Sequence, residues 1–232
     1  MNHSPNLLLS SLSAQTFEVL RPHLHLFELK QGLVVGEPSA PVTTVYFPHS
    51  GIISLVVALS VGDIIETAMV GKDGAVHAAS ALDGKVSLNR AVVQMAGHAT
   101  VIAAQKLQEI ADENRELRTL LIRHEQVLFA QAQQSGACNA SHLVEARLCR
   151  WLLRTRDLAG DDELHVTQEF LAQMLGVRRS SLSLVANTLQ QAGYISYKRG
   201  RGRITAPNGL KETACECYDA VREHYARLLT PA

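Results

Sequence analysis

The chain has 232 residues, 47% of them hydrophobic, which is enough for one large or two ordinary domains with buried cores. Its 22 basic and 22 acidic residues cancel, which excludes a uniformly basic DNA-coating protein, and no apolar run approaches the ~20 residues that span a bilayer. The N-terminus lacks a basic region followed by an apolar core, and the four cysteines form no C-x-x-C pair. We therefore expect a cytoplasmic protein with reduced thiols and no membrane partner.

The N-terminal part begins with helical spacing over residues 7–20 and then changes to short strands. From Leu24 to residue 103, strand-length segments alternate with Gly, Pro and Asp breakers. Strands at about ten-residue spacing with no helix between them predict an all-β barrel or roll, a fold that commonly encloses a small ligand. We assign residues 1–104 to this sensor domain.

A long helix is predicted over residues 105–137. Its apolar positions alternate three and four residues apart, which is coiled-coil-like spacing and usually needs a partner helix. We assign it to homodimerisation, and the alternative is an amphipathic helix packed on the barrel. The expected interface consists of Leu117, Leu120, Leu121, His124, Val127, Leu128 and Gln131. The segment 135–139, with Gly136, is the expected hinge.

Residues 138–232 contain the pattern of a winged helix-turn-helix. A helix capped by Thr167 ends at Gly176, and it is followed by a second helix over 178–191 and a glycine-rich hairpin over 194–205. The second helix and the hairpin carry six basic residues and no acidic one. This order of parts predicts that the second helix enters the DNA major groove.

The polar face of this motif supplies the candidate DNA contacts. We expect Arg179, Ser180 and Ser183 to read or approach bases, because arginine reaches guanine edges and small hydroxyls permit close approach. Asn187 lies on the same outer face, and Leu184 there either touches a thymine methyl or turns back to the core. The side chains expected mostly to position phosphates are Thr167, Gln168, Arg178, Ser181, Lys198, Arg199, Arg201 and Arg203.

A β-roll, a long helix, a hinge and a winged helix-turn-helix in this order resemble the Crp/Fnr family of bacterial transcription regulators. The most specific parts of the resemblance are residues 137–153 and 164–193, with TQEFLAQMLGVRR, and the ACECY stretch at 214–218. The resemblance implies an α+β protein with a cyclic-nucleotide-binding-like β-roll (a double-stranded jelly roll), a dimerisation helix and a C-terminal winged helix-turn-helix. It also implies a homodimer that binds a palindromic promoter site in double-stranded DNA and contacts RNA polymerase.

The sensor departs from the better-known branches of that family. The cyclic-AMP branch holds its ligand with a Gly-Glu and a later Arg-Ser pair, whereas the matching stretches here, 75–79 and 87–91, contain no acid. This argues against a cyclic nucleotide, although Arg90 lies one position from the expected arginine. The first cysteine is Cys138, so the N-terminal iron–sulfur cluster of the oxygen-sensing branch is not expected either. We predict no cofactor.

The candidate effector pocket, for an effector that the sequence does not identify, consists of His77, Asn89 and Arg90. For His77, a haem or metal ligand is weighed against a hydrogen-bonded structural role, which we favour. Cys215 and Cys217 would point to different faces of the last helix, one packed and one exposed.

No nucleophile–base pair, phosphate loop or metal-ligand spacing is evident, so we expect neither an enzyme nor a metal site. The sequence predicts a homodimeric, sequence-specific DNA-binding regulator with a degenerate cyclic-nucleotide-type sensor. The alternative is a small-molecule-binding or scaffold protein whose helix-turn-helix does not bind DNA.

Overall fold

The computed structural model describes residues 4–60, 62–164, 166–198 and 201–230. The N-terminal part contains two short helices, α1 (Leu7–Ser10) and α2 (Ala14–Leu20), followed by an antiparallel sheet. The strands of this sheet are β1 (His25–Leu29), β2 (Val34–Gly36), β3 (Thr44–Ala58), β4 (Ile64–Val70) and β5 (Arg90–Ala103). They follow the order β1-β5-β3-β4, with β2 also paired to β5. The predicted β-roll is thus confirmed.

Two long strands, β3 and β5, form the centre of this sheet, and each joins two of the expected short strands. Their pairing shifts register between Pro48 and Ile53, where the sequence suggests a break. Gly97 of β5 makes this pairing possible, because a Cβ there would come within 2.4 Å of the backbone carbonyl of Ser50. The sequence pattern predicts a further short strand over residues 74–78, but this segment forms only an isolated bridge between Tyr46 and Val76.

The expected long helix is two helices, α3 (Ala104–Glu113) and α4 (Arg115–Ser141). Asn114 separates them with an extended backbone, and its side-chain oxygen accepts a hydrogen bond from the amide of Leu117 at 2.9 Å. No bend occurs at Gly136, because α4 continues past the expected boundary at 137 to Ser141. The chain instead turns at His142, which has extended backbone angles.

The C-terminal part contains the helices α5 (Val144–Ala159), α6 (Gln168–Leu175), α7 (Arg179–Gln191), α8 (Pro207–Thr213) and α9 (Cys217–Leu229). Its small sheet consists of β6 (Glu163–Leu164), β7 (Ile195–Lys198) and β8 (Arg201–Ile204), in the order β6-β8-β7. The winged helix-turn-helix is therefore confirmed. The sequence pattern predicts one final helix over residues 210–229, but the structure divides this region into α8 and α9. No helix within the described residues is long and apolar enough to cross a membrane.

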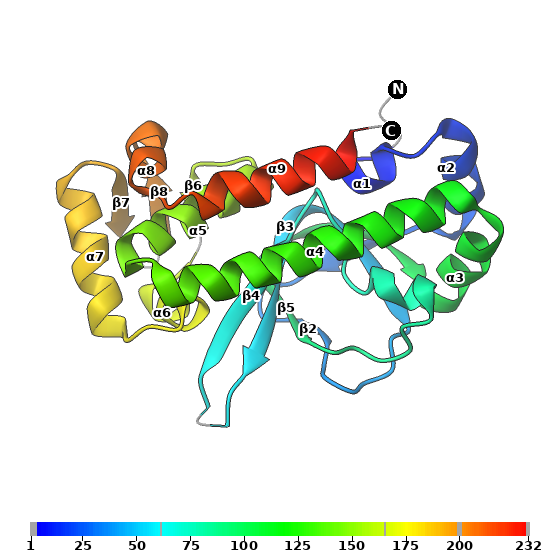
Figure 1. Ribbon diagram of the computed structural model, residues 1–232, viewed down its shortest axis with the longest axis horizontal. Coiled ribbons are helices and arrows are strands. Elements are labelled where there is room, and N and C mark those ends of the chain that lie inside the picture. Colours follow the sequence, from blue (N-terminus) through cyan, green and yellow to red (C-terminus); the bar gives the residue numbers. More distant parts are fainter. Residues whose placement is uncertain (1–3, 61, 165, 199–200, 231–232) are drawn as a thin grey trace.

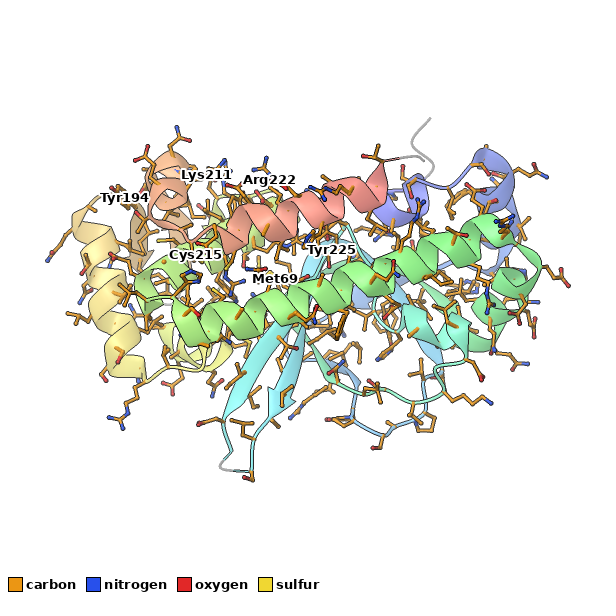
Figure 2. The ribbon with its side chains drawn as sticks, in the orientation of Figure 1. Met69, Tyr194, Lys211, Cys215, Arg222 and Tyr225 are labelled. Atoms are coloured by element: carbon orange, nitrogen blue, oxygen red, sulfur yellow. The ribbon has the colours of Figure 1, made fainter. Side chains whose placement is uncertain are left out.

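The helices α4 and α9 run side by side along the molecule, with the β-roll against α4 (Figure 1). The ends of the molecule differ: α1, α2 and α3 lie at one end, whereas α6, α7 and α8 lie at the other. Figure 2 labels Met69 of β4 and Tyr225 of α9 in the middle of the molecule, where α4 packs against both β4 and α9. The Tyr225 hydroxyl donates a hydrogen bond of 2.8 Å to the side-chain oxygen of Gln131 in α4.

The apolar seam of α4 faces the interior of its own chain, which corrects part of the expected dimer interface. Leu117 and Leu121 are buried in a core shared with α1 and α2. His124 is fully buried and its Nε2 accepts a hydrogen bond from the amide of Ala75 at 3.0 Å, while Gln131 donates to the carbonyl of Met69 at 3.3 Å. These four side chains cannot face a partner, because the β-roll and α9 already cover them.

Leu120, Val127 and Leu128 are only half-buried and pack at the edges of the same cores. The large apolar side chains that α4 does expose are Ile122 and Phe129, at 41% and 64% of their full area.

Candidate DNA-binding surface and its connections to the β-roll

The turn between α6 and α7 is built as the sequence predicts. Thr167 caps α6, and its Oγ1 accepts a hydrogen bond from the amide of Phe170 at 3.1 Å. Gly176 ends the helix with a φ of 60°, a left-handed conformation that glycine adopts without steric cost. Arg178 then stands at the N-cap of α7. The two helices are thus held in the arrangement of a helix-turn-helix.

The two faces of α7 differ sharply in burial. Leu182, Ala186 and Leu189 are buried in the core of the C-terminal domain. The outer face is exposed, and its candidate contact residues are Arg178, Arg179, Ser180, Ser181 and Asn187. Leu184 is 71% exposed on this face and does not turn back to the core. An exposed apolar side chain among these polar residues is suited to contact a thymine methyl group.

Two of the predicted contacts are partly engaged with each other. The Ser183 hydroxyl donates a hydrogen bond of 2.8 Å to the side-chain oxygen of Gln168, and both residues are half-buried. This bond joins the outer face of α7 to the first turn of α6. Arg179 is 3.1 Å from the carboxylate of Glu169, but both side chains are more than 60% exposed. Such an exposed pair contributes at most ~1 kcal/mol, so Arg179 can exchange it for a phosphate or a base.

The wing is attached to the helices by its tyrosine. The Tyr197 hydroxyl donates to the carbonyl of Val166, and its amide donates to the side-chain oxygen of Gln190 at 3.1 Å. Arg203 is exposed on β8. Arg199, and the side chains of Lys198 and Arg201, lie outside the described part of the structure. The backbones of Lys198 and Arg201 pair with each other at the end of the hairpin.

The helix α6 and the turn that follows it lie beside β4 of the β-roll and the hairpin before that strand. Gly62, Asp63 and Ile64 of the hairpin line one pocket together with Arg178 and Arg179. A Cβ on Gly176 would come within 3.0 Å of the Ile65 side chain. The helix-turn-helix is therefore in contact with the sensor domain through α6 and the glycine that ends it, a connection that the sequence pattern does not reveal.

A polar cluster in the interface between the β-roll and α5 is centred on Glu66. The carboxylate of Glu66 accepts hydrogen bonds from Trp151 Nε1 at 2.9 Å and from the Ser54 hydroxyl at 2.5 Å, and Ser54 also contacts Gln94. Desolvation by burial raises the pKa of Glu66 to about 7, although these hydrogen bonds and the charges of Arg150 and Arg154 act in the opposite direction. Glu66 therefore titrates near neutral pH.

We expect Glu66 to make the protein less stable as the pH rises. Because the pKa of Glu66 in the folded state lies above the ordinary value of 4.5, the folded protein binds more protons than the unfolded chain between about pH 4.5 and 7. Over this range the contribution of Glu66 to the free energy of unfolding falls by up to roughly 1.4 kcal/mol per pH unit. Glu66→Gln cannot ionise and keeps an acceptor for Trp151. In chemical denaturation at pH 5 and pH 8, the free energy of unfolding of the variant relative to the wild type should be higher at pH 8 than at pH 5. Equal pH dependence in both proteins would contradict this assignment.

A buried ion pair forms the second connection. Arg154 of α5 is 2.7 Å from the carboxylate of Asp73, which follows β4, and the side chains are 8% and 10% exposed. The guanidinium also lies 4.5 Å from the ring centre of Tyr225 in α9. One side chain of α5 thus joins the β-roll to α9.

The expected effector residues lie around the end of β2, although no contact joins all three in the described structure. His77 has a left-handed φ of 69°, and its Nδ1 is 3.2 Å from the carbonyl of Thr44. Its Nε2 is buried without a hydrogen-bond partner among the described residues and borders Gly36. Desolvation by burial lowers the pKa of His77, which keeps the ring neutral. This inward-facing histidine fits the structural role.

Arg90 lies 3.4 Å from the carboxylate of Glu37 at the surface, so part of its charge is already balanced. Asn89 is exposed, and its backbone carbonyl accepts a hydrogen bond of 2.7 Å from the Ser87 hydroxyl.

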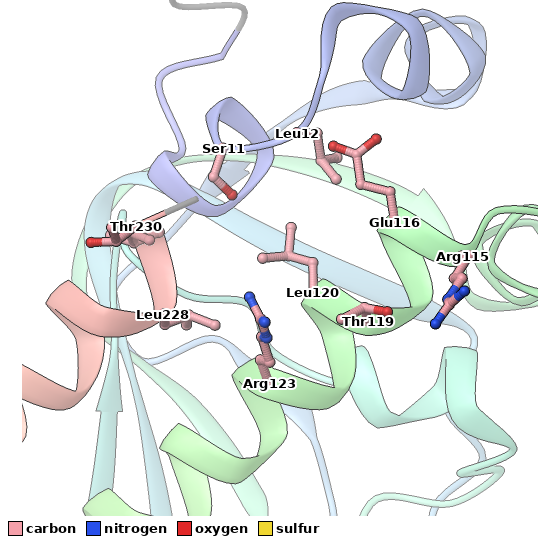
Figure 3. Close-up of a pocket in the computed structure, with 10 residues that line it drawn as sticks. Ser11, Leu12, Arg115, Glu116, Thr119, Leu120, Arg123, Leu228 and Thr230 are labelled. Atoms are coloured by element: carbon pink, nitrogen blue, oxygen red, sulfur yellow. The ribbon is translucent and has the colours of Figure 1, made fainter. Parts of the chain in front are cut away.

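A separate surface pocket lies at the opposite end of the molecule from α7. It is lined by the two residues after α1, the start of α4 and the end of α9, including Arg115, Arg123 and Leu228 (Figure 3). Glu116 on its rim accepts hydrogen bonds from the Ser13 amide and hydroxyl at 2.7 and 2.6 Å. These contacts attach α4 to the N-terminal helices, and Glu116 is thereby occupied.

A cluster of cysteines and a histidine lies where the end of α4 meets the start of α9. Cys138, His142, Cys215 and Cys217 bring their Sγ atoms and a ring nitrogen within 4.8 Å of one another. Cys215, labelled in Figure 2, is 8% exposed and Cys217 is 1% exposed. The expected exposure of one of these two thiols is wrong, because Cys215 precedes α9 and is folded under the end of α4.

Comparisons with known proteins agree with this architecture. Residues 146–213 match the model of the Crp-like helix-turn-helix domain. No curated protein matches the chain. A putative Crp/Fnr transcriptional regulator from Eubacterium rectale has 16% identity and a TM-score of 0.68, covering 89% of this chain and 96% of its own.

Two further structures have similar scores. FixK2 from Bradyrhizobium japonicum has 14% identity and a TM-score of 0.68, covering 83% of this chain and 98% of its own. A Crp/Fnr regulator from Thermus thermophilus has 22% identity and a TM-score of 0.66, covering 82% of this chain and 98% of its own. At these identities the likeness is one of fold. This chain therefore contains a Crp-like helix-turn-helix domain and has the fold of the Crp/Fnr transcriptional regulators.

Proposed function

We propose that this protein is a homodimeric transcription regulator that binds a palindromic site in double-stranded DNA through α7. The observation that carries the proposal is the exposed polar face of α7, presented by a domain that matches the Crp-like helix-turn-helix. Such a helix enters the major groove and contacts base edges near its N-terminus. The structures that it resembles are described as transcriptional regulators, so we also propose RNA polymerase as a partner and no enzymatic activity.

The contacts divide into base readout and phosphate contact. Arg179, Ser180 and Ser183 are proposed to read or approach bases from the first half of α7. Arg178, Ser181 and Arg203 are exposed and are proposed to contact phosphates, together with Thr167 and the basic tip of the wing. Phosphate contacts release counterions, so the logarithm of the affinity should fall linearly with the logarithm of the salt concentration.

Fluorescence anisotropy with labelled fragments of the protein's own upstream region tests this function. We expect at least one fragment to bind more tightly than a scrambled sequence, with a salt slope of about −0.9 per phosphate neutralised. If no fragment binds even at low salt, with or without cell extract, the protein is instead a small-molecule-binding or scaffold protein with an inactive helix-turn-helix.

For the dimer we propose the outer face of α4, which replaces the seam expected from the sequence. Ile122 and Phe129 are seven residues apart, a heptad spacing that places both on one side of the helix. Thr119, Gln126 and Gln133 are exposed and continue the same stripe at three- and four-residue steps. We propose that this face packs against α4 of a second copy of the chain, because helix-turn-helix proteins bind paired half-sites as dimers.

Replacing both apolar side chains by charge should separate the dimer. We expect Ile122→Glu/Phe129→Glu to be a folded monomer by sedimentation, because neither side chain is part of a buried core of the chain. Leu88→Glu is the matched control, since Leu88 is an 84% exposed leucine in the N-terminal domain, outside α4. A double variant that sediments like the wild-type dimer would exclude this face as the interface.

The β-roll is proposed to sense a signal that is not a cyclic nucleotide. Arg90 is paired with Glu37, and no acidic residue stands in the stretches that correspond to the nucleotide cassette. A signal that alters the contact of β4 with α6, or the contacts of Glu66 and Arg154, would reorient the DNA-binding domain, because these contacts join the two domains.

A further inference from the structure

The cluster of Cys138, His142, Cys215 and Cys217 has the residue types of a structural metal site. Cys138 and His142 are four residues apart at the end of α4, so they lie on the same side of the helix. Cys215 and Cys217 approach from the segment that starts α9, more than 70 residues further along the chain. Three cysteines and one histidine are a ligand set of closed, four-coordinate zinc sites.

The distances within the cluster fit one tetrahedral ion. The Sγ atoms of Cys138 and Cys215 are 3.5 Å apart, and Cys217 Sγ is 3.6 Å from Nδ1 of His142. Zinc bonds of ~2.3 Å to sulfur and ~2.0 Å to nitrogen place tetrahedral ligand atoms ~3.5–3.8 Å from each other. The thiols are free, and their separation is far longer than a disulfide bond of ~2.05 Å.

The surroundings of the cluster are those of a metal centre. The other ring nitrogen of His142, Nε2, lies 3.1 Å from the carboxylate of Glu216, which fixes the tautomer that leaves Nδ1 free to bind. The side-chain amide of Gln134 donates to Cys217 Sγ at 3.0 Å. An amide donor to sulfur and a carboxylate behind histidine both orient the ligand atoms inward.

The charge around the cluster also suits a bound zinc ion. Zn²⁺ with three thiolates and a neutral imidazole has a net charge of −1. Arg150 of α5 exerts a favourable charge interaction on Cys138, and Arg147 interacts in the same sense with Cys138 and Cys215. The Nε atoms of both arginines are buried without a hydrogen-bond partner among the described residues. The positive charges of these two guanidinium groups therefore offset the negative charge of the proposed zinc site.

We propose that Cys138, His142, Cys215 and Cys217 bind one Zn²⁺ ion that fastens the end of α4 to the start of α9. On binding, each of the three thiols releases a proton to solvent, and His142 binds through Nδ1 in its neutral form. All four positions are filled by side chains, so the ion has a structural role. It holds the junction at which the helix of the sensor domain passes into the DNA-binding domain.

The metal content of the full chain tests this site. The protein is purified under reducing conditions, and zinc is measured by mass spectrometry against protein concentration. We expect one zinc per chain in the wild type and in Cys149→Ala, since Cys149 is a buried thiol outside the cluster. Cys217→Ser should lose the metal. Co²⁺ added to zinc-free protein should give the visible bands of tetrahedral cobalt and thiolate charge transfer.

Two milder variants keep the test decisive if Cys217→Ser fails to fold. His142→Cys should retain the metal as a four-cysteine site, with stronger charge transfer in the cobalt form. Glu216→Gln should weaken zinc binding by about 10–100-fold without changing the ligand set. A folded wild type that binds neither zinc nor cobalt at one ion per chain would overturn the proposal. So would an octahedral cobalt spectrum, iron–sulfur absorption, or a Cys138–Cys215 disulfide in place of the metal.

Discussion

Arg154→Ala is expected to lower the free energy of unfolding by about 3–5 kcal/mol, because it leaves a buried carboxylate without its counter-charge. Asp73 is 7% exposed and its paired oxygen is 2.7 Å from the guanidinium. The other oxygen of Asp73 is buried without a hydrogen-bond partner in the described structure, so it offers no compensating contact. The variant also loses the stacking of Arg154 over Tyr225.

Denaturant unfolding measured by tryptophan fluorescence and circular dichroism checks this value. Arg156→Ala is the matched control, since the neighbouring Arg156 pairs with Asp162 at the surface and should cost at most ~1 kcal/mol. The double variant Asp73→Asn/Arg154→Met should recover part of the loss, because it removes both charges. Equal losses for Arg154→Ala and Arg156→Ala would show that the buried pair does not hold α5 against the β-roll.

Arg178→Ala/Arg179→Ala is expected to lower affinity for the operator by at least about 30-fold. A good arginine contact to a base contributes ~1–3 kcal/mol, and each 1.4 kcal/mol corresponds to a factor of ten. Both side chains are exposed at the start of α7, so the fold should be unaffected. The loss should be larger on the operator than on random DNA, because Arg179 is assigned to base readout and Arg178 to phosphate.

The controls separate this contact from general electrostatics. Arg21→Ala removes an exposed arginine that is paired with Glu18 in the N-terminal part of the chain. Because this arginine does not belong to the helix-turn-helix, the variant should bind the operator with unchanged affinity. Glu169→Ala frees Arg179 from its carboxylate and should preserve or raise affinity. Unchanged operator affinity in Arg178→Ala/Arg179→Ala would remove the start of α7 from the DNA interface.

The helix-turn-helix could be predicted from the sequence because its signals are local. Thr167 caps α6, Gly176 has the left-handed φ that its position demands, and the apolar stripe of α7 is buried as its spacing indicates. Asn114 is different: an extended asparagine that caps the next helix is invisible in a continuous apolar pattern, so α3 and α4 look like one helix.

The seam of α4 shows the main limit of periodicity. Spacing identifies a buried stripe, but it does not say whether the β-roll or a second chain covers it. Here the β-roll covers His124 and Gln131, and the exposed stripe through Ile122 and Phe129 is too polar to stand out. The same limit hides the contact of β4 with α6.

The polar contacts of Glu66 and of the cysteine cluster could not be predicted, because they join residues far apart in the chain. Glu66 and Trp151 are separated by 85 positions, and Cys138 and Cys215 by 77. A Cys-x-x-x-His pair and a Cys-x-Cys pair are each too weak alone to indicate a metal site. Glu66 in the strand IIETAMV, where Thr67 is the other polar residue, is the one local signal of an acid in this interface.

Selection of DNA from a random library by the purified full chain tests the central claim most directly. The proposed function predicts enrichment of an inverted repeat whose half-sites lie about one helical turn, ~10 base pairs, apart. An insertion of half a turn between the half-sites should then abolish tight binding, because it rotates the second groove away from the second α7. Enrichment of no sequence, or binding indifferent to half-site spacing, would contradict a dimer that reads DNA through α7.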